Sequence, residues 1–335
     1  MRMLYIYQNY RKSFTGLGST FMKEFQKKDN EISFFEFKII TPNRIINKLL
    51  SITKVNSIFF KIQNYSLIKT IKKTNVDKIF VFKGTDLNYN TLKSIKDLGV
   101  KIFGFNPDDP FNRASCKIDL ETSITLYDKF FIWSELLVNR IDKIKPKNVH
   151  YLPFATDTNI IKLKEFKGFN YDISFIGNAD EERVKWIKDL AKLVSDLSLS
   201  INIDVFGNSW PSIKGVTLHG QVNGDGYFEV IRSSKCSINI LRLQNKNSNN
   251  MRTFEVPASG GILYHEFSLE AKKIFHDDDP VYFFSSSQEL LDIYLKNLEN
   301  IDEIQRRTND LSKKMNSYKF SYSNRIDYIL NIINE

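Results

Sequence analysis

Long hydrophobic runs are absent from this sequence of 335 residues, and cysteine is scarce. No apolar stretch approaches the ~20 residues that a helix needs to cross a bilayer, and the first apolar stretch is too short for a signal peptide. The two cysteines, Cys116 and Cys236, lie far apart and match no metal-binding spacing. We therefore expect a cytoplasmic protein with free thiols and no transmembrane segment.

The motifs of hydrolases and of metal centres are also missing. The sequence contains no G-x-S-x-G and no Cys–His pair with supporting context, which disfavours hydrolase chemistry. None of the four histidines has a partner at metal-ligand spacing. We expect no required cofactor; a divalent metal ion is kept as an alternative that the sequence does not favour.

Charge of one sign is in excess. The 48 Lys and Arg residues outnumber the 39 Asp and Glu residues, which gives a net charge of +9. Such a balance favours an anionic partner: nucleic acid, a membrane surface or a phosphorylated substrate. However, the basic residues are spread along the chain and are mostly Lys, which a simple compositional bias would also produce. A nucleic-acid partner is therefore kept as an alternative.

Short hydrophobic runs alternate with helix-like segments throughout, which predicts an α/β fold. The length favours two domains, and the stretch 152–170, which lacks periodicity, is the expected linker. We expect a domain at 1–155 and another at 170–310, each resembling a Rossmann fold. Strands are predicted at 3–9, 31–37, 78–84, 100–106, 128–134, 148–153, 171–178, 201–208, 235–241, 261–265 and 281–284. Helices are predicted through Phe21, Phe25 and Lys28, and at 43–73, 89–98, 180–196, 224–233, 251–259, 286–298 and 301–335.

The stretch 249–263, NNMRTFEVPASGGIL, holds the most informative group of polar residues. Arg252 and Glu255 are three apart and share a helix face. Arg252 could bind a phosphate, Glu255 could accept hydrogen bonds from ribose hydroxyls, and residues 259–261 could offer N–H groups to a phosphate. The alternative is a surface ion pair between Arg252 and Glu255, followed by Gly260 as a helix C-cap. Pro257 predicts that this helix is short or kinked.

Two further places in the second half carry weaker signals. Gly177 and Asn178 follow a predicted strand and precede a helix that contains Arg183, an arrangement suited to an anion or to a plain turn. His219 is predicted in a turn after a strand, where it could approach a ligand or serve only the turn.

In the first half, Asp108 and Asp109 follow the strand 100–106, so they are candidates for a general base or for acceptor binding. The alternatives are a divalent metal site and a turn that uses Asp for local hydrogen bonds. Candidates for lining a cleft are weaker: Gly16, Gly18, Lys83, Asp86 and Arg113.

Residues 252–261, RTFEVPASGG, resemble the signature of CgeB-like glycosyltransferases, which belong to the group 1 set with the GT-B fold. The resemblance covers most of 150–300 in the same order. It includes residues 172–178 with Arg183, and residues 206–210, 237–240, 279–284 and 287–291. The first half is similar only loosely, through residues 151–157 and the Asp-Asp-Pro loop.

The resemblance implies two Rossmann-like domains facing across a cleft, with the C-terminal helix, 311–335, packing back on the first. It implies transfer of a hexosyl group from a nucleotide-sugar, with UDP-sugar favoured, to an acceptor hydroxyl on a glycan, protein or other macromolecule. Glu255 would hold the ribose and Arg252 would lie near the diphosphate. The remaining donor-binding residues would be Gly177, Asn178, Arg183, His219, Thr253, Phe254, Ser259, Gly260 and Gly261.

One position departs from the family pattern. Many group 1 enzymes carry a second Glu eight residues before the first, and here that residue is Asn247. Two other functions therefore remain open: a noncatalytic protein that binds nucleotide-sugar, and a nucleic-acid-modifying glycosyltransferase or nucleic-acid binder, suggested by the charge.

Overall fold

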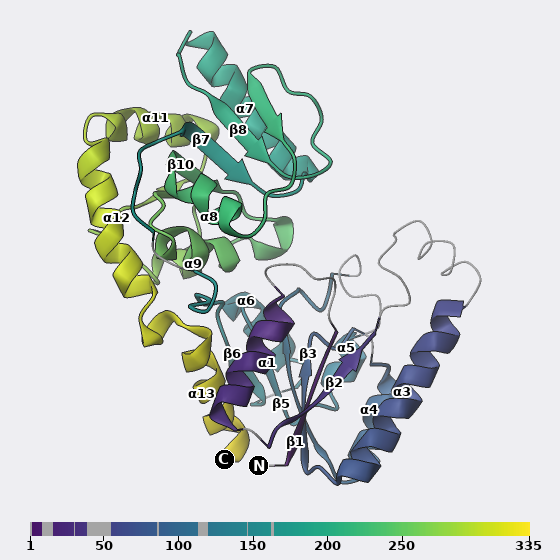
Figure 1. Ribbon diagram of the computed structural model, residues 1–335. Coiled ribbons are helices and arrows are strands. Elements are labelled where there is room, and N and C mark those ends of the chain that lie inside the picture. Colours follow the sequence, from purple (N-terminus) through teal and green to yellow (C-terminus); the bar gives the residue numbers. More distant parts are fainter. Residues whose placement is uncertain are drawn as a thin grey trace. The chain divides into compact units, whose positions relative to one another are not determined.

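The computed structural model describes residues 2–8, 16–29, 31–38, 55–85, 87–112, 120–145, 147–161 and 164–335 (Figure 1). Asp86, Arg113 and the predicted helical residues before 55 lie outside this part. The chain forms two compact units, Met1–Pro153 with Arg325–Glu335, and Phe154–Asn324. Each unit contains one six-stranded parallel sheet flanked by helices, so the predicted α/β fold is confirmed.

The sheet of the first unit has the strand order β2-β1-β3-β4-β5-β6, and every pairing is parallel. This is a doubly wound order, in which the direction of winding reverses between β1 and β3. The strands are β1 (Met3–Gln8), β2 (Ser33–Phe37), β3 (Lys78–Phe82), β4 (Lys101–Asn106), β5 (Lys129–Ile132) and β6 (Val149–Tyr151). The helices are α1 (Leu17–Lys28), α3 (Val55–Thr74), α4 (Tyr89–Asp97), α5 (Leu120–Ile124) and α6 (Glu135–Asp142).

Aromatic side chains fill the core of the first unit. The ring of Tyr5 on β1 stacks on that of Phe80 on β3, with centroids 6.0 Å apart, and Phe21 on α1 stacks on Phe105 of β4 at 5.1 Å. All four side chains are buried, and burying each one stabilises the fold by roughly 1.5–3 kcal/mol. The runs of Phe and Tyr that predicted strands therefore also supply the contacts between the sheet and α1.

The sheet of the second unit has the order β12-β11-β10-β7-β8-β9, again entirely parallel. The order reverses between β7 and β10, at the centre of the sheet, and ligands of such folds sit at the carboxyl ends of the strands beside this reversal. The strands are β7 (Tyr171–Ile176), β8 (Ile203–Phe206), β9 (Val216–His219), β10 (Ser234–Asn239), β11 (Leu263–Glu266) and β12 (Val281–Phe284). The connecting helices are α7 (Glu181–Asp196), α8 (Asp225–Arg232), η1 (Leu243–Asn245), α9 (Met251–Ala258), α10 (Leu269–Lys272) and α11 (Ser287–Leu298).

The C-terminal region is broken where one helix was predicted over 301–335. It consists of α12 (Ile301–Met315), the short η2 (Tyr318–Phe320) and α13 (Tyr322–Asn334). Asn316 is the C-cap residue of α12, and its side chain donates to the carbonyls of Ala258 and Ser312. Residues from Arg325 onward belong to the first unit, where Lys28 pairs with Asp327 at 2.7 Å.

Candidate functional site

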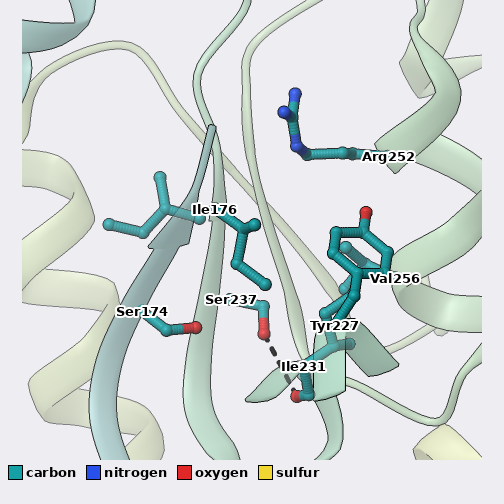
Figure 2. A pocket seen from close by; sticks show the side chains of 8 residues that line it. Ser174, Ile176, Tyr227, Ile231, Ser237, Arg252 and Val256 are labelled. Atoms are coloured by element: carbon teal, nitrogen blue, oxygen red, sulfur yellow. Dashed lines mark hydrogen bonds between the residues drawn. The ribbon is translucent and has the colours of Figure 1, made fainter. Parts of the chain in front are cut away.

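A small hollow lies at the strand-order reversal of the second unit (Figure 2). It is shallow and opens partly to solvent. Two strands and two helices supply its walls. We call it the β7–β10 hollow, and its lining residues are Ser174 and Ile176 on β7, Ser237 and Ile238 on β10, Tyr227 and Ile231 on α8, and Arg252 and Val256 on α9.

Arg252, in the first turn of α9, is a cation without an acidic partner. Within the described part of the chain it forms no ion pair and no hydrogen bond, and its buried Nε atom is unsatisfied. Its guanidinium lies 5.9 Å from the ring centre of Phe175 and directly over Gly177. A Cβ atom on Gly177 would approach Nη2 of Arg252 to 2.9 Å. Because Gly177 has no side chain, the unpaired guanidinium of Arg252 has space to lie against the end of β7.

Glu255 lies one turn further along α9 and is 5% exposed. Its Oε2 atom accepts a hydrogen bond of 2.8 Å from the hydroxyl of Tyr227 on α8. Burial raises the pKa of Glu255, whereas the Tyr227 hydrogen bond and the charge of Arg252 oppose that rise, and Asp157 adds to it. Glu255 and Arg252, both described in the structure, form no ion pair with each other. The alternative interpretation of these two residues as a surface ion pair is therefore wrong.

The loop after β7 forms a turn with limited capacity for an anion. The N–H groups of Gly177 and Ala179 already donate to the carbonyls of Phe206 and Asn208. Among these three consecutive residues, only the N–H of Asn178 has no acceptor in the described chain. The anion site suggested by the strand-turn-helix pattern therefore reduces to this N–H and the neighbouring guanidinium of Arg252.

Arg183 is a buried structural cation. Its guanidinium donates to the carbonyls of Asn178 and Ile240, at 3.3 and 3.2 Å, and lies 3.5 Å from the carboxylate of Asp180, which caps α7. Burial, with repulsion from Arg252 and Arg242, lowers the pKa of Arg183 to about 9. Its hydrogen bonds to Asn178 and Ile240 tie the loop after β7 to the end of β10, so this residue fixes the geometry around Arg252.

Residues 259–261 do not present N–H groups to a ligand. The N–H of Ser259 donates to Glu255, that of Gly260 to Pro257 and that of Gly261 to Val256. Gly260 has a φ of +81°, the left-handed conformation of a helix C-cap. The prediction that these N–H groups bind a phosphate is wrong because they complete the end of α9, and the C-cap interpretation holds.

Thr253 and Phe254 point into the domain interior and not into the hollow. Thr253 is fully buried, and its hydroxyl lies 2.8 Å from Nε2 of His265. Phe254 is 1% exposed. Direct contact of these two side chains with a donor is therefore excluded in this conformation, and their role is to seat α9 on the sheet.

His219 is the last residue of β9 and not a turn residue as predicted. Its Nε2 atom lies 2.7 Å from Asp204 of the neighbouring strand, and its ring stacks on Phe206 with centroids 4.2 Å apart. These contacts hold the imidazole against the end of β8.

In the first unit, the two candidate catalytic aspartates differ. Asp108 pairs with Lys83 at 2.7 Å, and each side chain is 23% exposed. Asp109 accepts a hydrogen bond from the N–H of Phe111, the local turn that the sequence left open as an alternative. Lys83 and Asp108, predicted separately, are thus brought together after β3 and β4.

The two glycines predicted at the start of α1 also have structural contacts. Gly16 is the N-cap residue, and its carbonyl accepts hydrogen bonds from Thr20 and Ser19. A Cβ atom on Gly18 would lie 3.2 Å from the ring of Phe82, so this glycine lets α1 approach β3 closely. Asp86 and Arg113 lie outside the described residues.

Tyr227 is the residue that the sequence analysis missed. It stands in a predicted helix with no motif around it, and nothing in its spacing links it to Glu255, 28 positions away. Only the pairing of α8 with α9 across the β7–β10 hollow brings the two side chains together.

No cluster of three or more potential metal ligands from His, Cys, Asp and Glu occurs among the described residues. Over the same residues, none of the helices is both long enough and apolar enough to cross a membrane.

A family model described as glycosyl transferase-like matches residues 183–331. No curated protein matches the chain in sequence. Solved structures do match: HepE of Anabaena in complex with UDP and glucose has 10% identity and a TM-score of 0.66, with all of both chains covered. TarM of S. aureus has 12% identity and a TM-score of 0.61; the match covers 82% of this chain and 58% of TarM. The DNA-modifying β-glucosyltransferase of T4 phage has 13% identity and a TM-score of 0.60, with 99% of this chain and 100% of that chain covered.

At these identities the likeness establishes the fold. The chain has the GT-B fold, with two parallel six-stranded sheets in two units. The family match covers most of the second unit, including Arg183, Arg252 and Glu255; the residues of the β7–β10 hollow on β10, α8 and α9 lie within it, whereas those on β7 precede it.

Proposed function

We propose that the protein transfers a sugar from a nucleotide-diphosphate-sugar, in first place a UDP-sugar, to an acceptor hydroxyl on a glycan, protein or other macromolecule. One observation carries the proposal: Arg252, without an acidic partner in the described chain, lies beside Gly177 and one helical turn from the buried Glu255, where the strand order reverses. Because Arg252 and Glu255 do not pair with each other, the cation can bind a phosphate while the carboxylate binds hydroxyl groups of the same ligand.

Each residue has a defined task in this proposal. Arg252 binds the diphosphate and neutralises the charge that develops as it leaves, aided by the N–H of Asn178. Glu255 accepts hydrogen bonds from the two ribose hydroxyls, as an acidic residue does in dinucleotide sites. Tyr227 holds one carboxylate oxygen in place. No metal ion is assigned a role, and membership of the CgeB-like subgroup is part of the proposal.

Thermal unfolding in the presence of nucleotides is the first test. A ligand that binds only the folded protein raises its melting temperature. We expect one series among UDP, GDP, CMP, ADP and dTDP, with their sugars, to raise it equally with and without EDTA. Detection of transferred or hydrolysed sugar then separates an enzyme from a noncatalytic binder.

The Glu255→Ala variant tests the assignment of the site. It should abolish most of the shift given by the active nucleotide, because the ribose loses its acceptor. Glu229→Ala is the matched control, since Glu229 lies on α8 with a side chain that is 55% exposed. An unchanged shift in Glu255→Ala would show that the nucleotide binds elsewhere.

A further inference from the structure

Only one of the two units of the protein has a net positive charge. The first unit carries 27 Lys and Arg against 16 Asp and Glu, a net charge of +11, whereas the second carries 21 against 23, a net charge of −2. A compositional bias spread evenly over the chain would not divide in this way. The first unit is therefore the one whose net charge would attract an anionic macromolecule or membrane surface.

Within that unit, α3 presents a face that is both apolar and basic. Ile58, Ile62 and Tyr65 are 57%, 59% and 74% exposed. They stand at positions i, i+4 and i+7, which share one side of a helix. The same side carries four exposed lysines, and we call the seven residues the α3 outer face: Ile58, Lys61, Ile62, Tyr65, Lys69, Lys72 and Lys73.

The opposite side of α3 accounts for its attachment to the domain. Gln63, Asn64, Leu67 and Ile71 are buried there. At 100° per residue, the α3 outer face spans an arc of about 120° on the other side and runs about 22 Å along the helix. The exposed isoleucines are therefore not needed to hold α3 on its own domain.

Charge on this helix has one sign only. The sequence of α3 contains no Asp or Glu, and none of its four exposed lysines forms an ion pair within the described residues. An isolated exposed isoleucine is ordinary, but here three exposed apolar side chains and four unpaired lysines share one face. Such a face offers apolar contact and electrostatic attraction to an anionic surface together. The long lysine side chains can lie along the apolar surface and keep their charges at the headgroups.

We propose that the α3 outer face docks the protein on an anionic membrane surface. Ile58, Ile62 and Tyr65 enter the interfacial region, while the lysines contact acidic headgroups. A second copy of the chain fits this face less well because two lysine faces would repel each other. Nucleic acid also fits less well, since the exposed aliphatic side chains would gain nothing from a phosphate backbone. The proposal does not depend on the proposed enzymatic function.

Co-sedimentation with phosphatidylcholine vesicles, with and without phosphatidylglycerol, tests it on the full chain. The protein should bind only the anionic vesicles. A Lys69→Gln, Lys72→Gln, Lys73→Gln variant should lower binding about 100-fold at low salt, from about fivefold for each lysine. An Ile58→Ser, Ile62→Ser variant should lower it at least tenfold without a change of charge.

A charge-matched control lies on the other unit. Lys185, Lys188 and Lys192 are exposed on α7, and their joint replacement by Gln should change vesicle binding less than twofold. An equal loss in this control would overturn the proposal, because net charge and not the α3 outer face would then govern binding. Each variant should keep the melting temperature and the nucleotide shift of the parent, which separates this test from that of the proposed function.

Other occupants of the face would give different results. If duplex DNA binds and the Ile58→Ser, Ile62→Ser variant binds vesicles like the parent, the face is a purely electrostatic surface for nucleic acid, and the membrane proposal fails. If the parent is a dimer in solution, the isoleucine variant is monomeric and anionic vesicles are not bound, the face is an interface between copies, and the proposal fails equally.

Discussion

The hydroxyl of Tyr227 lies 2.8 Å from Oε2 of Glu255, so that α8 and α9 are joined across the β7–β10 hollow by a hydrogen bond to a buried carboxylate. Burial raises the pKa of Glu255, and this hydrogen bond opposes the rise because it favours the ionised form. Tyr227 therefore favours the ionised state of Glu255, which accepts hydrogen bonds from hydroxyl groups, and it fixes the position of one oxygen.

Replacing Tyr227 by Phe tests this role. Without its hydroxyl, the pKa of Glu255 should rise further, and nucleotide binding should weaken at a higher pH than in the parent as the solution is acidified. At neutral pH we expect a loss of affinity of about threefold to tenfold, the worth of one hydrogen bond. Titration calorimetry from pH 5 to 8 measures both effects. Tyr89→Phe, in the first unit, is the control. If affinity falls at the same acidic pH in Tyr227→Phe as in the parent, the role of Tyr227 is packing alone.

Arg252→Ala should separate diphosphate binding from nucleoside binding. Hydrogen bonds to a charged group contribute about 1.5–3 kcal/mol, so affinity for UDP should fall roughly 10- to 150-fold while affinity for uridine changes little. Because Arg252 has no ion-pair partner in the described chain, the free energy of unfolding should stay within about 0.5 kcal/mol of the parent. Arg306→Ala, at an exposed position of α12, is the control. Equal losses for UDP and uridine would place Arg252 away from the phosphates.

Asp108→Asn and Asp109→Asn form a matched pair of variants on one loop. If Asp108 is the general base, its replacement should lower kcat by about 10²–10⁴-fold with little change in donor affinity. Asp109 accepts a backbone hydrogen bond in a turn, so its replacement should act on stability more than on turnover. Steady-state kinetics with both variants measures these effects. Equal kcat values for the parent and Asp108→Asn would show that Asp108 is not the general base.

Glu255→Gln should reveal a stability cost at the site. The folded-state pKa of Glu255 is raised, mainly by burial, so the contribution of this group to stability is complete below its ordinary pKa and is lost as the pH rises through the folded-state pKa. The variant should gain about 0.5–2 kcal/mol over the parent in the free energy of unfolding at pH 8, and less at pH 5. Urea unfolding at both pH values measures the difference. A variant less stable than the parent at pH 8 would show that the carboxylate is stabilising.

The sequence predicted the strands well because hydrophobic runs such as those of β4 and β7 are buried on both faces of a parallel sheet. It also placed Arg252 and Glu255 on one short helix. It misjudged residues 259–261, because a run of Ser and Gly can offer its N–H groups either to a ligand or to the preceding helix, and only the backbone conformation decides. Tyr227 could not be found at all, since its contact with Glu255 depends on how α8 and α9 pack.

Gly177→Ala should weaken nucleotide binding while changing the stability of the fold little. The new methyl group would lie 2.9 Å from Nη2 of Arg252, the free end of a flexible side chain that can move away at small cost to stability. It would also lie 3.2 Å from the buried ring of Phe175, which must shift slightly. The affinity for UDP should then fall about tenfold, in keeping with a displaced charge-assisted hydrogen bond, while the melting temperature stays close to that of the parent. Gly220→Ala is the matched control, because a Cβ atom at Gly220 would meet nothing within 4 Å. In an Arg252→Ala background the Gly177→Ala substitution should have no further effect on UDP affinity. Additive losses in the double variant would mean that Gly177 acts on the nucleotide directly and not through Arg252.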